Sequence, residues 1–316
     1  MIQRQSKDRI NKILAIVDGH QGGLESEIYT RLARRNWSVG LETASVTDLF
    51  SAIYRGKVDG IIFKDSQALP VSLLLRYQIA DPIAILMPTL AIYDQEHERD
   101  QNSLRTLGEP TLISSSANTV SFISEFEWMV RKWQTGAFNK LGRARMNIVS
   151  GKVQVGLKAI NALMEHSELC SLVVICLAKY LRKQKNIIAA EKILLTALKN
   201  SSKGLGVVLS LVDLYLSTGM PDTALHFLKS AKARFGYSKA ILIDFIQAYV
   251  LINEPQKILE VAEVARKENF LPEVLSQFVA RLYYAGGNVS LLRELPDLQK
   301  INADAFEKEW ASTLVS

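Results

Sequence analysis

The chain has 316 residues, of which 48% are hydrophobic and 22% charged, enough to build two ordinary hydrophobic cores and too apolar for a disordered protein. Its formal charge of +6 is uneven: residues 1–136 hold 15 basic and 16 acidic residues, so the remainder carries all of the positive excess. No apolar run approaches the roughly 20 residues of a membrane span, and the charges at the N-terminus are not followed by the apolar core of a signal peptide. We therefore expect a cytoplasmic protein without a membrane span.

The residue types that carry most catalytic and metal chemistry are few and scattered. The two cysteines, Cys170 and Cys176, lie in an apolar stretch with no histidine nearby, which predicts reduced packing residues. The four histidines stand in unrelated contexts and join no nucleophile or ligand pattern. We expect no enzyme activity, no catalytic residues, no metal site and no cofactor.

The first half of the chain alternates short apolar runs with amphipathic segments. This alternation predicts a parallel sheet covered by helices on both faces, with a ligand site at the carboxyl ends of the strands. Residues 91–107, rich in charge, are expected to form a loop or a short exposed helix, and the glycines between 19 and 23 form either a plain turn or a phosphate-binding turn. The expected strands cover residues 13–17, 38–43, 60–63, 83–87 and 111–113, and the expected helices 24–35, 46–54, 71–77 and 118–133.

The order and spacing of these elements over residues 11–134 resemble the receiver domain of two-component response regulators. That resemblance implies a five-stranded, flavodoxin-like α/β fold for residues 1–136. It also implies an acidic pair that binds Mg²⁺, a phosphorylated Asp at the end of the third strand, a hydroxyl residue at the end of the fourth and a Lys at the end of the fifth.

The positions that match this receiver pattern are mostly altered. Asp18 keeps one acidic position, but Lys64 stands where the phosphorylated Asp is expected and Asp65 lies one residue beyond it. Met87 best matches the hydroxyl position, and the fifth strand ends in serines rather than Lys. We therefore expect a pseudo-receiver that is not phosphorylated, and a response regulator that uses Asp65 remains the alternative.

Past Gly136 the sequence repeats itself with a period of 34 residues. In each repeat a small or apolar residue recurs at one position, and a residue that tolerates a left-handed conformation is expected in the turn between two helices. The first set is Gly156, Ala190, Ala224 and Ile258, and the turn set is Gly151, Lys185, Gly219, Asn253 and Gly287.

A 34-residue helix–turn–helix unit with an aromatic residue in its first helix, such as Tyr215 or Tyr249, resembles the tetratricopeptide repeat (TPR). The resemblance implies an all-α solenoid over residues 137–316, with four repeats, a partial fifth and capping helices from 291 to 314. It also implies a groove, lined by the first helices, that binds a peptide or protein. One groove position recurs in each first helix and is occupied by Arg145, Lys179, Asp213, Gln247 and Arg281, and Arg182 and Lys183 fall at further groove positions. The N-terminal part of the groove is therefore basic, which favours an acidic ligand.

These features predict a non-catalytic signalling adaptor or scaffold of a two-component-like pathway, which binds a protein or acidic peptide. Nucleic-acid binding through the basic repeat region is the alternative, given the sequence pI of about 9.1.

The linker between the two halves, residues 134–136, is too short for a flexible tether, so we expect the halves to hold a preferred orientation. Trp128 and Trp133 on the preceding helix serve either the core or a docking and homodimer surface.

Overall fold

The structure is a computed structural model that describes residues 12–18, 24–66, 70–94, 101–200 and 204–267. The turn at residues 19–23, the partial fifth repeat with Arg281, and the expected capping helices lie outside these residues.

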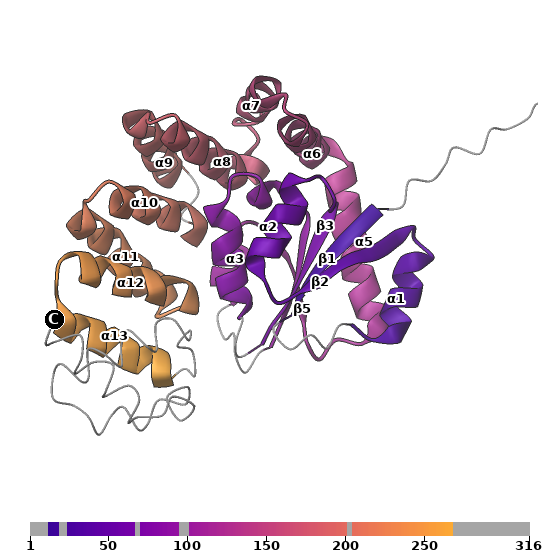
Figure 1. Ribbon diagram of the computed structural model, residues 1–316, viewed down its shortest axis with the longest axis horizontal. Helices are drawn as coiled ribbons and strands as arrows, with labels where there is room; N and C mark the ends of the chain where they lie inside the picture. The colour runs from indigo at the N-terminus through magenta and orange to yellow at the C-terminus, as the bar shows by residue number, and fades with distance from the viewer. Residues whose placement is uncertain (1–11, 19–23, 67–69, 95–100, 201–203, 268–316) are drawn as a thin grey trace, which may run out of the picture.

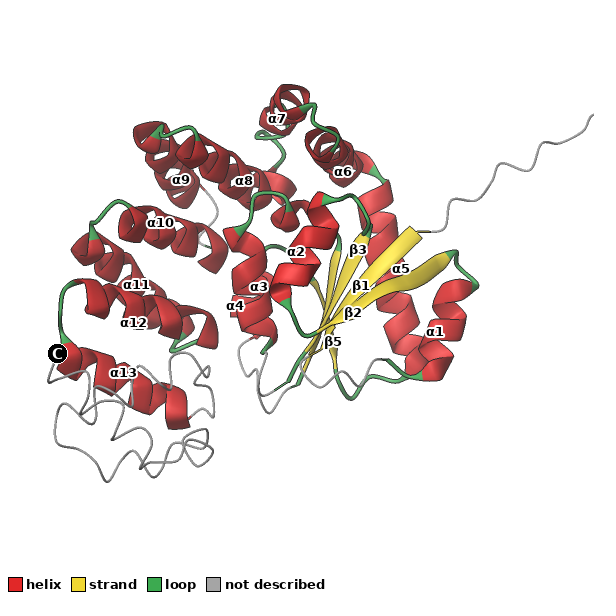
Figure 2. Cartoon of the chain, viewed as in Figure 1, coloured by secondary structure: helices red, strands yellow, loops and turns green. Residues whose placement is uncertain are grey.

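The first part of the chain is an α/β domain built on a five-stranded parallel sheet with the strand order β2-β1-β3-β4-β5 (Figure 2). This order is the flavodoxin-like arrangement that the sequence predicts. Successive side chains of a strand point to opposite faces, so Leu14 and Ile16 enter one core while Ala15 and Val17 enter the other. The strands are β1 (Lys12–Asp18), β2 (Trp37–Thr43), β3 (Gly60–Lys64), β4 (Thr89–Tyr93) and β5 (Thr111–Ser114).

Helices cover both faces of the sheet. α1 (Ser26–Ala33) and α5 (Thr119–Gln134) contribute to the core on one face, and α2 (Val46–Tyr54) and α3 (Val71–Ala80) to the core on the other. Side-chain caps fix where two of them begin: the Ser45 hydroxyl accepts from the Asp48 amide at 3.2 Å, and Asn118 accepts from the Ser121 amide at 2.9 Å. The bounds of α2 are those predicted from the sequence.

The predicted fourth strand, residues 83–87, is wrong. These residues include a 3₁₀ turn, Ala84–Leu86, which begins where the Asp81 carboxylate accepts from the amides of Ile83 and Ala84 at 2.8 Å each. The strand β4 starts only after Pro88. An apolar run of five residues has the same composition in a buried turn as in a buried strand, so the pattern could not separate them. Met87 therefore precedes the fourth strand and does not end it.

The charged segment that follows is also more structured than predicted. Residues 91–93 complete β4, and α4 (Gln101–Arg105) is a short helix whose Leu104 is fully buried. The short helix in this segment was therefore predicted correctly, whereas its exposure was not, because Leu104 is buried.

The remainder of the described chain forms paired helices that follow one another along one side of the α/β domain (Figure 1). They are consistent with a helical repeat region. A short 3₁₀ turn, Ser167–Leu169, precedes the second pair. The pairs are α6 (Gly136–Val149) with α7 (Val153–Asn161), α8 (Cys170–Lys183) with α9 (Ile187–Asn200), α10 (Leu205–Ser217) with α11 (Pro221–Phe235), and α12 (Lys239–Leu251) with α13 (Pro255–Lys267).

The 34-residue period has a direct structural counterpart in the turn inside each pair. Gly151, Lys185, Gly219 and Asn253 all have positive φ, at 86°, 61°, 74° and 57°. The left-handed conformation predicted for these positions is thus confirmed, even at the lysine. Close helix approach explains the small residues: a Cβ on Gly156 would lie only 2.7 Å from the backbone oxygen of Ala144.

One continuous apolar core links the two parts of the chain. It runs from the α2 and α3 face of the sheet into the helical pairs as far as α13. Thr135 alone separates α5 from α6, so the short linker is confirmed. No helix in the described ranges combines the length and the apolar character that crossing a membrane requires.

Candidate functional site

The groove positions predicted in two successive repeats meet in the structure. Lys179 of α8 and Asp213 of α10 are 34 residues apart, and the Lys179 Nζ lies 2.5 Å from an Asp213 carboxylate oxygen. We call the surface that α8, α10 and α12 turn toward the α/β domain the inner face, because α3 contacts α10 and α12 there.

The inner face holds a side chain from the α/β domain, Arg76 of α3. Its guanidinium binds Asp244 of α12 through two hydrogen bonds, of 3.0 Å from Nε and 2.9 Å from Nη2. It also binds Asp213, with a distance of 3.3 Å from Nη1 to one oxygen and a shorter contact from Nη2 to the other. A single arginine therefore joins α3 to two successive helical pairs. We call Arg76, Lys179, Asp213 and Asp244 the Arg76 cluster.

The Arg76 cluster is an internally balanced set of two cations and two carboxylates, in which Arg76, Lys179 and Asp244 are buried and Asp213 is partly exposed. Arg76 and Lys179 hold the pKa of Asp213 well below its usual range, whereas burial raises the pKa of Asp244. Burial lowers the pKa of Lys179, and the Asp213 carboxylate opposes that effect. The positive charge that the sequence assigned to this part of the groove is thus neutralised within the protein.

Backbone contacts close the same interface beside the Arg76 cluster. Thr106, just after α4, accepts from the first two amides of α10: its hydroxyl from Leu205 at 3.2 Å and its carbonyl from Gly206 at 3.0 Å. These amides have no partner within their own helix, so the α/β domain acts as the cap of α10. Cys176 of α8 also donates to the carbonyl of Pro82, at 3.2 Å.

The other predicted groove residues separate into different surroundings. Arg182 is half-buried and Lys183 exposed at the end of α8, whereas Arg145 of α6 is buried beside Asp59, away from the Arg76 cluster. Beside the Arg76 cluster is a hollow of about 260 Å³, lined by Ala80, Lys179, Arg182, Asp213, Leu216, Ser217 and Gln247. The accessible positive charge of this region therefore lies at the end of α8.

The residues of the predicted degenerate phosphoacceptor region, Asp18, Lys64 and Asp65, lie at the carboxyl edge of the sheet. Asp18 ends β1, Lys64 ends β3, and their side chains form a 3.0 Å ion pair in which Asp18 is buried. The lysine places an ammonium group beside the carboxylate that a receiver uses for Mg²⁺. In the described part of the chain, no three His, Cys, Asp or Glu side chains are arranged to hold a metal ion.

Asp65 has a structural role at the same edge. One carboxylate oxygen accepts from the Val71 amide at 2.9 Å, where α3 begins, and the other from the Asp94 amide at 3.3 Å, just after β4. Asp65 thus ties two loops together and supports the helix that carries Arg76.

The two tryptophans of α5 differ in exposure. Trp133 packs edge-to-face on Phe138 with ring centroids 5.1 Å apart, whereas Trp128 is 48% exposed and has the Lys132 ammonium 5.2 Å from its ring centroid. Of the two, Trp128 has the exposure that a docking or homodimer surface requires.

Comparison of the chain with protein-family models, with curated proteins and with solved structures finds no match. Its function must therefore be inferred from the geometry of the site.

Two residues of the Arg76 cluster, Arg76 and Asp244, were not predicted. Arg76 is the only charged residue of α3 and Asp213 the only one of α10, and in α12 Asp244 is accompanied only by Lys239 at the first position. A charge on such a helix needs a buried partner of opposite sign, and these three charges satisfy one another. That complementarity is the signal that could have found them.

We expect Arg76→Met to lower the free energy of unfolding by about 3–5 kcal/mol at neutral pH, because it leaves buried carboxylates without their shared cation. The loss should shrink as the pH falls: without Arg76 the pKa of Asp244 rises further, and protonation removes the unpaired charge. Urea unfolding at several pH values measures both effects.

As a control, Arg31→Met breaks the surface ion pair with Glu27 and should lower the unfolding free energy by no more than about 1 kcal/mol. If both variants lose the same unfolding free energy, the Arg76 cluster contributes no more to stability than an exposed ion pair.

We expect the full chain to gain no phosphoryl group from acetyl phosphate and Mg²⁺, as measured by intact-mass spectrometry. The Lys64 ammonium is paired with Asp18, and both oxygens of Asp65 accept backbone hydrogen bonds. Labelling that Asp65→Asn abolishes would contradict this and establish the phosphorylated alternative.

Proposed function

We propose that this chain is a non-catalytic signalling adaptor, in which a receiver-like domain is docked onto an array of tetratricopeptide-type repeats that binds a protein partner. The observation that carries the proposal is the Arg76 cluster. Two successive helical pairs bind, through Asp213 and Asp244, a charged side chain presented by a helix from outside the array, and Asp213 occupies a predicted groove position. The inner face is therefore chemically suited to hold a protein segment.

The carboxyl edge of the α/β domain supports a role that is independent of phosphorylation. In a phosphorylated receiver the acidic residues bind Mg²⁺, a cation that requires several oxygen ligands in near-octahedral geometry. Here the ammonium of Lys64 neutralises Asp18 instead, and Asp65 anchors the start of α3. The domain is thus proposed to present α3 to the array constitutively.

The partner is proposed to bind where the inner face is not covered by α3. Arg182 lines the hollow of about 260 Å³, and the exposed Lys183 follows it at the end of α8. Two cations next to a hollow with apolar walls from Ala80 and Leu216 suit an acidic segment of another protein. This location keeps the predicted acidic partner and moves its site from the centre of the groove to the edge.

We expect Arg182→Glu/Lys183→Glu in the full chain to lose a protein partner that the native chain retains in a pull-down. The matched control is Lys192→Glu/Lys199→Glu, which makes the same change of charge at exposed positions of α9 and should retain the partner. Equal loss in both variants would contradict a localised protein site. A duplex-DNA titration at two salt concentrations distinguishes the alternative class: DNA binding that both variants weaken equally would favour a diffuse nucleic-acid footprint.

A further inference from the structure

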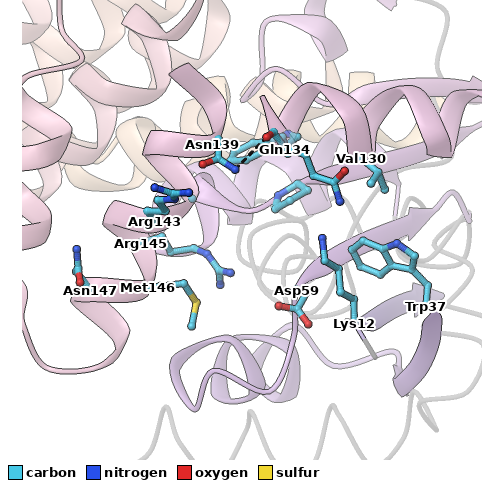
Figure 3. A pocket seen from close by; sticks show the side chains of 13 residues that line it. Lys12, Trp37, Asp59, Val130, Gln134, Asn139, Arg143, Arg145, Met146 and Asn147 are labelled. Atoms are coloured by element: carbon cyan, nitrogen blue, oxygen red, sulfur yellow. Dashed lines mark hydrogen bonds between the residues drawn. The ribbon is translucent and has the colours of Figure 1, made fainter. Parts of the chain in front are cut away.

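A second pocket lies at the opposite, amino edge of the sheet, far along the strands from Asp18 and Lys64. It has a volume of about 570 Å³, within the range of roughly 300–1,000 Å³ usual for small-molecule sites. Lys12 and Trp37 begin β1 and β2, and Asp59 directly precedes β3; α5 and α6 close the other side (Figure 3). The pocket therefore sits where the α/β domain meets the first helix of the helical region.

Arg145 is the unusual residue of this pocket. Its side chain projects from α6 toward Asp59 (Figure 3), and the residue is only 5% exposed. Its Nε and Nη1 find no hydrogen-bond partner among the residues that the structure describes. Burial lowers the pKa of Arg145, and Asp59 opposes that effect. A buried cation with two unused donors is costly, so a ligand that supplies oxygen acceptors would be stabilised at this position.

The charge and the walls of the pocket define that partner. Lys12, Arg143 and Arg145 outweigh Asp59, whose carboxylate already accepts from the Ile13 amide at 3.0 Å. A guanidinium matches a carboxylate or phosphate, with which it forms parallel charge-assisted hydrogen bonds. The apolar part of the lining comes from Trp37, Pro88, Val130, Trp133 and Met146.

We propose that this pocket binds a small organic anion, whose carboxylate or phosphate is held by Arg145 and whose apolar body packs against the tryptophan side of the pocket. Among the described residues that line the pocket, only Asp59 carries a carboxylate, so the lining does not neutralise its three cations. The site is separate from the inner face and does not depend on the proposed adaptor function.

The test compares anionic probes with neutral counterparts on the full chain, by calorimetric titration and thermal shift. AMP is paired with adenosine, and phenylacetate with phenylacetamide, at low millimolar concentrations. At least one anion should bind about 10-fold or more tightly than its neutral counterpart, and Arg145→Met should remove that preference. Because Arg145 has unused donors, Arg145→Met should not lower the melting temperature of the unliganded chain. Lys12→Gln, at a partly exposed residue whose ammonium lies 5.2 Å from the Trp37 ring centroid, should weaken anion binding and leave the melting temperature unchanged.

Two results would overturn the proposal. If neither anion binds better than its neutral counterpart, the pocket has no anion site. If Arg145→Met lowers the melting temperature by several degrees while Lys12→Gln leaves anion binding unchanged, Arg145 serves as a structural partner of Asp59 and not as a ligand-binding residue. Lys199→Gln, an exposed change on α9, is the charge-matched control and should change neither measurement.

Discussion

The guanidinium of Arg76 is the constraint on which the arrangement of the chain depends. It is buried between Asp213 and Asp244, which come from successive helical pairs, and Lys179 completes the charge balance. A buried ion cluster contributes little net stability compared with well-packed apolar residues, but breaking it is costly. We infer that its main effect is on specificity, because displacing α3 from Asp213 and Asp244 would leave buried charges unpaired.

Apolar packing supplies the stability that the charges do not. The α2 and α3 face of the sheet and the helical pairs share one core, and Thr106 caps the start of α10 from the α/β domain. The sequence indicates two units. At their junction, however, each unit would expose apolar side chains of the shared core if the other were removed. A construction of this kind suits a rigid adaptor, whose binding residues keep fixed positions relative to one another. It also places Arg145 of α6 against the amino edge of the sheet, where the second pocket forms.

Local patterns predicted most of the secondary structure, and long-range pairing explains what they missed. The left-handed turns at Gly151, Gly219 and Asn253 followed from a period that each repeat contains within itself. The error at residues 83–87 arose because an apolar run does not reveal whether a carboxylate such as Asp81 starts a helical turn.

The basic groove could not be predicted correctly from local patterns. The repeat spacing placed Lys179 in the groove, but it could not show that Arg76, 103 positions earlier, occupies the same surface. Charge neutralisation across that distance is visible only in three dimensions.

We infer that the α/β domain and the helical region unfold as one cooperative unit, because they share a core and are joined by the Arg76 cluster. Differential scanning calorimetry of the full chain tests this most directly, because two-state unfolding makes the calorimetric and van't Hoff enthalpies equal. We predict a single transition in which the two enthalpies agree. Two separate transitions, or a single broad one whose calorimetric enthalpy is well above its van't Hoff enthalpy, would contradict this and show that the two parts unfold independently.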